Sequence, residues 1–367
     1  MIIKEVVRKQ QQLRSILVES VNSGSSKWYK IDIDIEPYSS NNNKSCCVDG
    51  SFDYYRHDHT FDLHHRFKSI TPSTLFITQE NQVLDVTSAA VIGHKLYKFI
   101  QTKIVFSDLD SPDSWLPLPS CPSITPLMRR SGPKLITNKG RLYVLACKTL
   151  DPAAGRDASL GLIFDPVDES WDTIANPVPD FHLPPNFYTV STSGGIILLL
   201  PQHWLLDHQS RQWTPPTSYY LNTDTGLWCS IHTAADFLSI LPSTVSNLVV
   251  VEQDSTIYGI TSISGCIFAY NLDTHQTRFG PVIGLEYTHF FYSLFHDAMK
   301  VSLVHVTADF FCLMYQDDLM PRSQTSNLHC LITRIVKLRS SLFMNVVGCF
   351  RAPVSGTCCF RNSFLLR

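Results

Sequence analysis

The chain has 367 residues and a formal net charge of −2 at pH 7. This balanced charge creates no overall field toward nucleic acid or an anionic membrane, so neither partner is expected. Charged residues make up 17% of the chain, below the usual value of about 25%. With 44% apolar residues, the composition predicts a loop-rich β protein that buries a large core.

The cysteines and the N-terminus bear on localisation. The chain has 11 Cys and no Cys-x-x-Cys spacing, and several, such as Cys266 and Cys312, lie inside apolar runs. A free thiol in such a run behaves as a small hydrophobic group, which favours a reduced environment. Charged residues interrupt Met1–Ser20, so no secretory signal is predicted, and no apolar run is long enough to span a membrane. We therefore expect a cytoplasmic and/or nuclear protein.

Two elements are predicted near the N-terminus. Apolar residues within 2–19 form a broken stripe at helical spacing, which predicts an N-terminal helical arm over residues 1–26. The arm is expected to lie on the following domain, and docking to a partner is the alternative. Trp28–Ile35 alternates apolar and polar side chains, so it is predicted as a strand that helps to close the domain.

A cluster of ligand-type side chains follows a polar loop. The cluster contains His57, His59, His64 and His65. Because their spacings match no common zinc pattern, no metal is expected, and a solvated linker is the preferred interpretation. A metal site at this cluster is the alternative.

The stretch Pro133–Ile174 predicts four short strands in succession. Asn138-Lys139-Gly140 provides the first turn, and Asp165-Pro166-Val167-Asp168 provides the last turn before Trp171. The inner strands are apolar on both faces, which is unusual in a sheet with one face in water. This pattern fits a sheet pressed between two similar sheets.

The same pattern recurs in Val91–Pro119, Gly194–Pro216 and Ser255–Gly280, and Leu221–Trp228 is a fragment of it. The predicted aromatic anchors are Trp115, Trp171, Trp213 and Phe279, at steps of 56, 42 and 66 residues. Other predicted structural anchors are Tyr143, Asp165 and Asp207. A period of about 40–50 residues with four strands per unit is typical of propeller blades. Each Trp is expected to be buried between blades, and stacking on a ligand is the alternative.

These units share a Leu-Tyr strand, an apolar strand that ends in Asp or Asn, a polar turn and a Trp. They resemble the kelch repeat over residues 88–282, most closely that of plant kelch-like propellers, many of which carry an F-box. No F-box is visible in this chain. The resemblance implies an all-β, kelch-like β-propeller of six blades, each with four antiparallel strands, over residues 27–350. A C-terminal tail without pattern is expected over residues 351–367.

The resemblance also implies a non-catalytic protein–protein interaction module, such as a substrate-recruiting or scaffold subunit. Kelch-like propellers hold a protein partner on loops at one rim. The candidate binding residues are Arg129, Arg130 and Ser131 before the first strand of the best repeat, and Arg156 and Asp157 in its long loop. Ordinary solvated loop charge is the competing interpretation of these residues. The sequence leaves the identity of the partner and the oligomeric state open.

No chemical motif is found. The chain has no Gly-x-Ser-x-Gly elbow and no phosphate-binding glycine loop, so no catalytic residue, metal or cofactor is predicted. Arg334, Lys337 and Arg339 are interpreted as protective charges on an edge strand. The alternative function is a propeller enzyme with a site in the central channel, such as a metal-dependent oxidase or a sugar-acting enzyme.

Overall fold

The structure is a computed structural model. It describes residues 12–22, 25–35, 72–79, 88–100, 102–111, 114–122, 124–126, 133–149, 159–178, 187–201, 205–206, 213–214, 217–231, 235–241, 246–261, 266–283, 301–317, 325–338, 341–355 and 359–366. These residues form β-strands almost throughout, with one short α-helix, α1 (Ala235–Ile240). No helix in the described part of the chain combines the length and the apolar character needed to cross a membrane.

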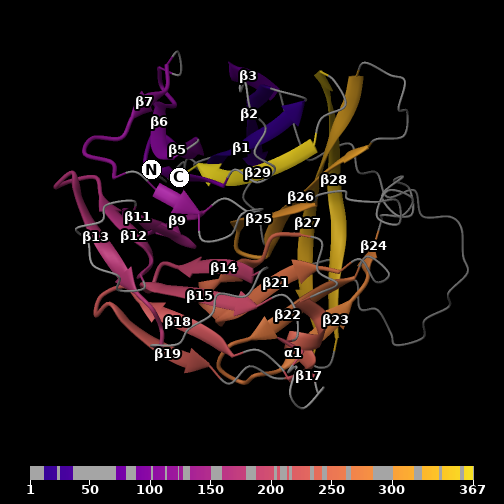
Figure 1. The fold of residues 1–367 in the computed structure, drawn as a ribbon. Helices are drawn as coiled ribbons and strands as arrows, with labels where there is room; N and C mark the ends of the chain where they lie inside the picture. Colours follow the sequence, from indigo (N-terminus) through magenta and orange to yellow (C-terminus); the bar gives the residue numbers. More distant parts are fainter. Residues whose placement is uncertain are drawn as a thin grey trace, which may run out of the picture.

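Five sheets of the described residues have four strands each and stand as blades around a common centre (Figure 1). The first blade contains, in spatial order, β29 (Cys359–Leu366), β1 (Gln12–Asn22), β2 (Ser25–Ile35) and β3 (Pro72–Gln79). The next contains β4 (Ala89–Ile92), β5 (Lys95–Ile100), β6 (Lys103–Asp108) and β7 (Leu116–Pro117). Blade β9–β13 contains β9 (Lys134–Asn138), β10 (Arg141–Leu145), β12 (Ser159–Asp165) and β13 (Ser170–Ala175).

The two remaining four-stranded blades follow along the chain. Blade β14–β19 contains β14 (Phe187–Thr192), β15 (Ile196–Pro201), β18 (Ser218–Asn222) and β19 (Leu227–Ile231). Blade β20–β23 contains β20 (Val249–Val251), β21 (Thr256–Ile260), β22 (Ile267–Asn271) and β23 (Thr277–Gly280). Two small hairpins pair β8 (Ile124–Pro126) with β11 (Cys147–Thr149), and β16 (Leu205–Leu206) with β17 (Trp213–Thr214).

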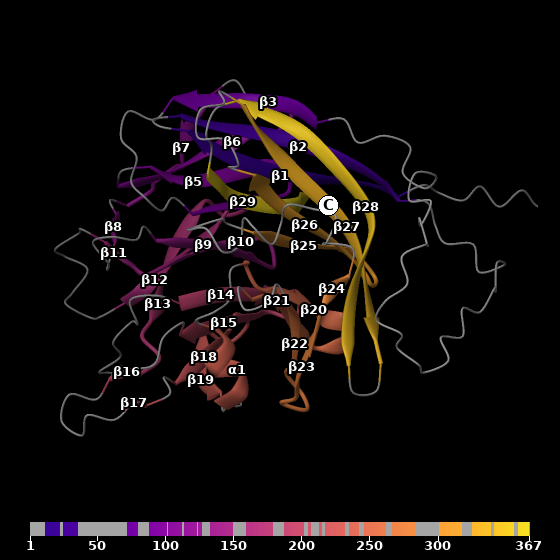
Figure 2. The same cartoon turned by 90° about the vertical axis from the view of Figure 1, so that its right-hand side faces the viewer.

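A five-stranded sheet departs from this form. It contains β25 (Ser302–Thr307), β26 (Phe310–Asp317), β27 (Thr325–Lys337), β28 (Leu342–Ser355) and β24 (Val282–Ile283). β27 and β28 are the two long strands along one side of the molecule in Figure 2, and β24 pairs parallel to β28. The prediction of six blades of four antiparallel strands is therefore wrong. The structure has five such blades, and this longer sheet shares the ring with them.

The edge strands nearest the centre follow one another in a closed circle. β4 contacts β9, and the contacts continue through β14, β20, β25 and β29 back to β4. The ring closes where β29 pairs antiparallel with β1, with Leu17 opposite Phe364. The fold is therefore a β-propeller whose two chain ends share one blade (Figure 1).

The predicted N-terminal helical arm is wrong for its described part, because residues 12–22 form β1. Ile16, Leu17 and Val18 are fully buried and consecutive. A helix lying on a surface buries one stripe, whereas a strand between two neighbouring sheets buries both faces. Trp28–Ile35 lies within β2 of the closing blade, as a strand, but the pair that closes the ring is β1 with β29. The tail predicted to lack pattern contains β29.

Aspartate and asparagine side chains shape the turns between the third and fourth strands. In four blades the third strand ends in Asp or Asn, and its Oδ1 accepts a hydrogen bond from the backbone N–H two residues later, at 2.9 to 3.1 Å. These residues are Asp108, Asp165, Asn222 and Asn271. Short polar side chains favour such turns because they satisfy backbone N–H groups locally. The predicted anchor Asp165 therefore has a structural role.

Tryptophans join neighbouring blades. The indole Nε1 of Trp171 donates to the carbonyl oxygen of Pro119 at 3.4 Å, and that of Trp228 donates to the carbonyl oxygen of Ala175 at 2.8 Å. Both acceptors belong to the preceding blade or directly follow its outer strand. Trp115 packs in a buried cluster that contains Leu17 of the closing blade. Trp115 and Trp171 therefore pack between blades. Tyr143 is fully buried in a different cluster, with Leu145 and Ile174.

One predicted anchor is corrected: Trp213 lies in the small hairpin of β16 and β17. The predicted anchor Asp207 lies outside the described residues. The blade uses Trp228 instead, in the segment that the sequence showed as a fragment, so the Trp residues at 115, 171 and 228 are 56 and 57 residues apart. This even step reflects the true repeat.

Phe279 does not occupy the aromatic position of its blade. Trp171 lies opposite Phe164 and Trp228 opposite Leu221, in each case the residue before the turn Asp or Asn. In blade β20–β23 the equivalent residue is Thr277, opposite Tyr270, whereas Phe279 is 46% exposed. Phe237 of α1 stacks on Tyr270 with ring centroids 4.1 Å apart. An aromatic ring from a helix between strands thus supplies part of the packing that the other blades obtain from Trp.

Candidate functional site

The predicted binding residues lie outside the described residues. Arg129, Arg130 and Ser131 fall between β8 and β9, and Arg156 and Asp157 fall between β11 and β12. The cluster of His57, His59, His64 and His65 also lies outside the described residues. Among the residues that the structure describes, no group of three or more His, Cys, Asp or Glu is placed to hold a metal ion.

The strand ends next to the two candidate binding segments, 127–132 and 150–158, are neighbours in one blade. Lys134, at the start of β9, pairs with Leu145 at the end of β10, and Leu145 pairs with Gly161 near the start of β12. The chain therefore enters blade β9–β13 at the same end after each of the two segments, at β9 and at β12. A Cβ on Gly161 would lie 2.1 Å from the carbonyl oxygen of Val144, so only glycine allows this close pairing.

At the opposite end of blade β9–β13, polar side chains link this blade to blade β14–β19. Lys139 Nζ donates to both carboxylate oxygens of Asp224 at 2.7 Å. Asn138 Nδ2 donates to Ser191 Oγ at 2.8 Å and to the carbonyl oxygen of Thr192 at 2.6 Å. These contacts link the end of β9 and its turn to the end of β14 and to the turn between β18 and β19.

The polar contacts continue at the next two junctions. Ser193, in the first turn of blade β14–β19, bonds through its backbone N–H and its hydroxyl to the Glu252 carboxylate. Asp254, in the first turn of blade β20–β23, forms an ion pair with Lys337 at the end of β27. Lys337 was interpreted as a protective charge on an edge strand, but β27 lies between β26 and β28. Its charge instead links two sheets of the ring.

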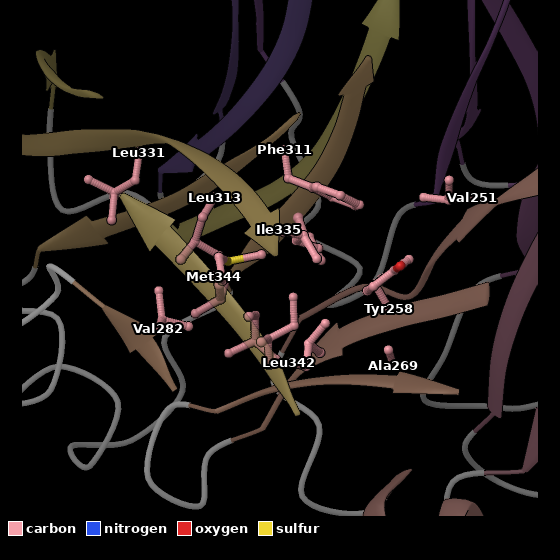
Figure 3. Close-up of a cluster of buried hydrophobic side chains, with 14 of the residues drawn as sticks. Val251, Tyr258, Ala269, Val282, Phe311, Leu313, Leu331, Ile335, Leu342 and Met344 are labelled. Atoms are coloured by element: carbon pink, nitrogen blue, oxygen red, sulfur yellow. The ribbon is translucent and has the colours of Figure 1, made fainter. Parts of the chain in front are cut away.

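Beneath this junction lies the apolar core between blade β20–β23 and the five-stranded sheet. The ring centroids of Tyr258 and Phe311 are 5.2 Å apart, and Leu342 and Met344 are fully buried in the same cluster (Figure 3). The cluster covers one face of each sheet. Burial raises the pKa of Tyr258 to about 12, so its hydroxyl stays protonated at neutral pH.

A polar cavity of about 160 Å³ opens at the same junction. Its walls come from the turns of blade β20–β23, from β22 and β23, and from the β27–β28 hairpin. They are formed by Asp254, Thr256, Ala269, Asn271, Thr274, Gln276, Arg278, Lys337 and Leu342. Sequence reasoning missed this group. Its members are ordinary turn residues along the chain, and only the ring brings Asp254 and Lys337 together.

The fold places the chain among the β-propellers. No family model matches the sequence, and no curated protein matches it. Three solved structures illustrate the range of its similarity. The N-terminal domain of Nup159 has a TM-score of 0.34 at 8% identity, over 72% of this chain and 63% of that chain. Hsv2 of Kluyvelomyces marxianus has a TM-score of 0.43 at 6% identity, over 91% and 85%.

A fungal alcohol oxidase of the AA5 family, in complex with copper, has a TM-score of 0.43 at 12% identity, over 93% of this chain and 63% of that chain. The chain spans less than two thirds of the Nup159 domain and of the oxidase. Similarities at this level concern fold alone and carry no argument about activity.

Proposed function

We propose that the protein is a non-catalytic interaction module of the kelch-like propeller type, which binds a protein partner through loops at one end of blade β9–β13. The observation that supports this proposal is the position of the strand ends that flank 127–132 and 150–158. Lys134, Leu145 and Gly161 are neighbours in register, so the strands that follow both segments, β9 and β12, begin at one end of one blade. Loops held on a rigid sheet are common binding elements.

The sequence of the two loops suggests the chemistry of the partner. Together they contain Arg129, Arg130 and Arg156 against Asp151 and Asp157, a net charge of +1. Arginine is enriched at interface hot spots, and its planar guanidinium binds carboxylates in a bidentate manner. An acidic segment of another protein is therefore the expected partner. The kelch-like assignment belongs to this proposal and rests on the Asp or Asn turns and the Trp residues between blades.

Affinity capture from cell extract, followed by binding measurements on the purified partner, tests the proposal. The double variant Arg129→Ala/Arg130→Ala should weaken binding at least about tenfold, with a smaller dependence on salt. Arg141→Ala is the matched control, because Arg141 lies at the opposite end of the same blade and pairs with Asp165 at 2.8 Å. The control should bind within about twofold of the unchanged protein.

Three outcomes would overturn the proposal. The first is equal binding by the loop variant and the unchanged protein, and the second is a loss of binding confined to Arg141→Ala. The third concerns catalysis: a stoichiometric transition metal in the purified protein, lost on changing His57 and His59, would favour an enzyme.

A further inference from the structure

Strand β28 is paired along its outer edge over only a short part of its length. β24 pairs with Met344 and Asn345 of this 14-residue strand. In the described ranges, no strand pairs with the outer edge of residues 346–355, and β28 runs along one side of the molecule (Figure 2). By comparison, the outer strands of the five blades have two to eight residues. This stretch, which we call the β28 edge, is longer than any of them.

The single proline of the β28 edge indicates which backbone groups face outward. Pro353 lies opposite Asn327 of β27, and proline has no N–H group. In a paired strand, proline is placed where its nitrogen faces away from the neighbouring strand. Because the backbone groups of successive residues face opposite sides of a strand, the N–H and C=O groups of Cys349 and Arg351 also face outward.

The contacts at the start of β28 give the same assignment. The backbone N–H of Met344 donates outward, to the carbonyl oxygen of Pro281 at 3.1 Å. Val347 has no opposite residue in β27, so it is the extra residue of a β-bulge. A bulge shifts the alternation by one residue, so the outward positions after it are Cys349 and Arg351. The β28 edge therefore presents donors and acceptors that fit a further strand.

A second copy of the chain carries a strand that fits this edge. When two β28 edges pair antiparallel about a two-fold axis at Phe350, Cys349 of each copy lies opposite Arg351 of the other. The N–H and C=O groups of these residues face outward, so each of the two pairs exchanges two backbone hydrogen bonds. One and the same surface serves both copies, as a two-fold interface requires.

The residues of the β28 edge are compatible with this pairing. Arg351 is the one charged residue within 346–355, and in this register no like charge lies opposite it. A bulge and a proline, which keep edge strands single, lie near the two ends, at Val347 and Pro353. The edge between them contains everything that its own pairing requires, which favours a second copy over a strand of another protein.

We propose that the protein forms a dimer in which two β28 edges pair antiparallel about a two-fold axis at Phe350 and join the two five-stranded sheets into one. The β28 edge belongs to the five-stranded sheet, whereas the proposed partner-binding loops belong to blade β9–β13. Either proposal therefore stands without the other.

Sedimentation velocity on the full chain tests the dimer. The buffer is reducing, so that the exposed Cys349 forms no disulfide between copies. The expected mass is twice 41.5 kDa. It should be reached at about 100 µM and should fall toward that of one chain on dilution to about 1 µM.

Variants locate the contact at the β28 edge. Arg351→Pro removes an outward N–H and leaves the pairing with β27 intact, so it should weaken the dimer at least about tenfold. Arg351→Ala is the matched control, because it removes the charge but keeps the N–H, and its dimer should be within about twofold of the unchanged protein. Circular dichroism checks that each variant is folded.

If Arg351→Pro fails to fold, Cys349→Arg carries the test. It changes an exposed side chain and places a positive charge opposite Arg351 of the second copy, so it should also weaken the dimer at least about tenfold. Cys229→Arg is its control, because Cys229 is exposed on β19, the outer strand of another blade. This control should leave the dimer unchanged.

A mass of one chain at about 100 µM would overturn the proposal, and so would a dimer that both edge variants leave intact. Hydrogen exchange at the amides of Cys349 and Arg351 separates the possible occupants of the edge. Protection that rises with protein concentration supports the second copy. Protection that does not depend on concentration would show that a segment of the same chain covers the edge, and would overturn the dimer.

Discussion

Two junctions of the ring solve the same packing problem differently. Between blades β9–β13 and β14–β19, Trp228 lies at the interface and donates to the carbonyl oxygen of Ala175. Between blade β20–β23 and the five-stranded sheet, which contains no Trp, the backbones approach so closely that a Cβ on Gly280 would lie 1.3 Å from the carbonyl oxygen of Leu342. Lys337 then bridges to Asp254 above the polar cavity.

A propeller ring therefore needs complementary faces but no particular residue at each junction. A large aromatic side chain fills the space between two sheets and adds a hydrogen bond. Where that residue is missing, glycine allows direct backbone contact, and the turns above close imperfectly over charged side chains. A polar cavity of about 160 Å³ is left at this junction.

The largest expected effect is at Gly280. Gly280→Ala places a methyl group against the backbone of β28, which cannot move without shifting the whole strand. We expect a loss of about 3 kcal/mol or more in the free energy of unfolding, measured by urea denaturation. Gly194→Ala is the control, because its added Cβ would meet only Thr192 Oγ1 at 3.6 Å. Equal stability of the two variants would show that this junction is not closely packed.

A smaller effect is expected at Trp228. Trp228→Phe keeps an aromatic ring but removes the indole N–H that donates to Ala175. The expected loss is about 1 kcal/mol, because the hydrogen bond to the exposed Ala175 and some packing between the blades are lost. Phe279→Leu, at an exposed position two residues beyond Thr277, should change stability by less than about 0.5 kcal/mol. A larger loss of stability for Phe279→Leu than for Trp228→Phe would show that Phe279 is the aromatic anchor of its blade.

The two ion pairs that link sheets should differ. Lys337→Met leaves the partly buried Asp254 carboxylate without its cation and should cost about 1 kcal/mol. Lys139→Met removes the more exposed pair with Asp224, whose side chain is 60% exposed, and should cost about 0.5 kcal/mol or less. Thermal unfolding at low and high salt separates them, since only the exposed pair should be strongly screened. A larger loss of stability for Lys139→Met than for Lys337→Met would contradict this account of the two ion pairs.

The smallest effect concerns pH and the turn of blade β9–β13. The backbone N–H of Val167, and also Arg141, hold the pKa of Asp165 below its usual value of 3.8. A carboxyl group with a lower pKa in the folded state stabilises the fold above its unfolded-state value, and this stability is lost as the pH falls through the folded value. Asp165→Asn should therefore be less stable at pH 7 by only a few tenths of a kcal/mol, because asparagine still accepts from the Val167 N–H and only the exposed pair with Arg141 is lost. The two proteins should converge below pH 3.8, and a constant difference at every pH would contradict this account.

The strands and the propeller class could be predicted from the sequence for a physical reason. Sheets that press on neighbours at both faces need consecutive apolar residues, and turns need Asp, Asn and Gly, so these signals are local. The same logic would have identified β1, whose run Ile16-Leu17-Val18 is buried on both faces. A broken helical stripe was given more weight than this short run.

The other wrong or missing predictions depend on strand register and on contacts between residues far apart in the sequence. Phe279 is two residues away from the aromatic position, and only the pairing of Thr277 with Tyr270 shows the offset. The segment around Trp213 has the same sequence pattern as the repeat, so Trp213 was predicted as the anchor in place of Trp228. The cavity could not be predicted, because Asp254 and Lys337 come from different sheets and meet only in the closed ring.

The central claim is that the sheets form a ring that β29 closes by pairing with β1. Deletion of residues 359–367, followed by thermal unfolding monitored by circular dichroism, tests it most directly. The ring predicts that the shortened chain loses its single cooperative transition, because Ile16, Leu17 and Val18 lose the strand that covers their backbone. A shortened chain that unfolds cooperatively at the same temperature as the full chain would contradict the closed ring.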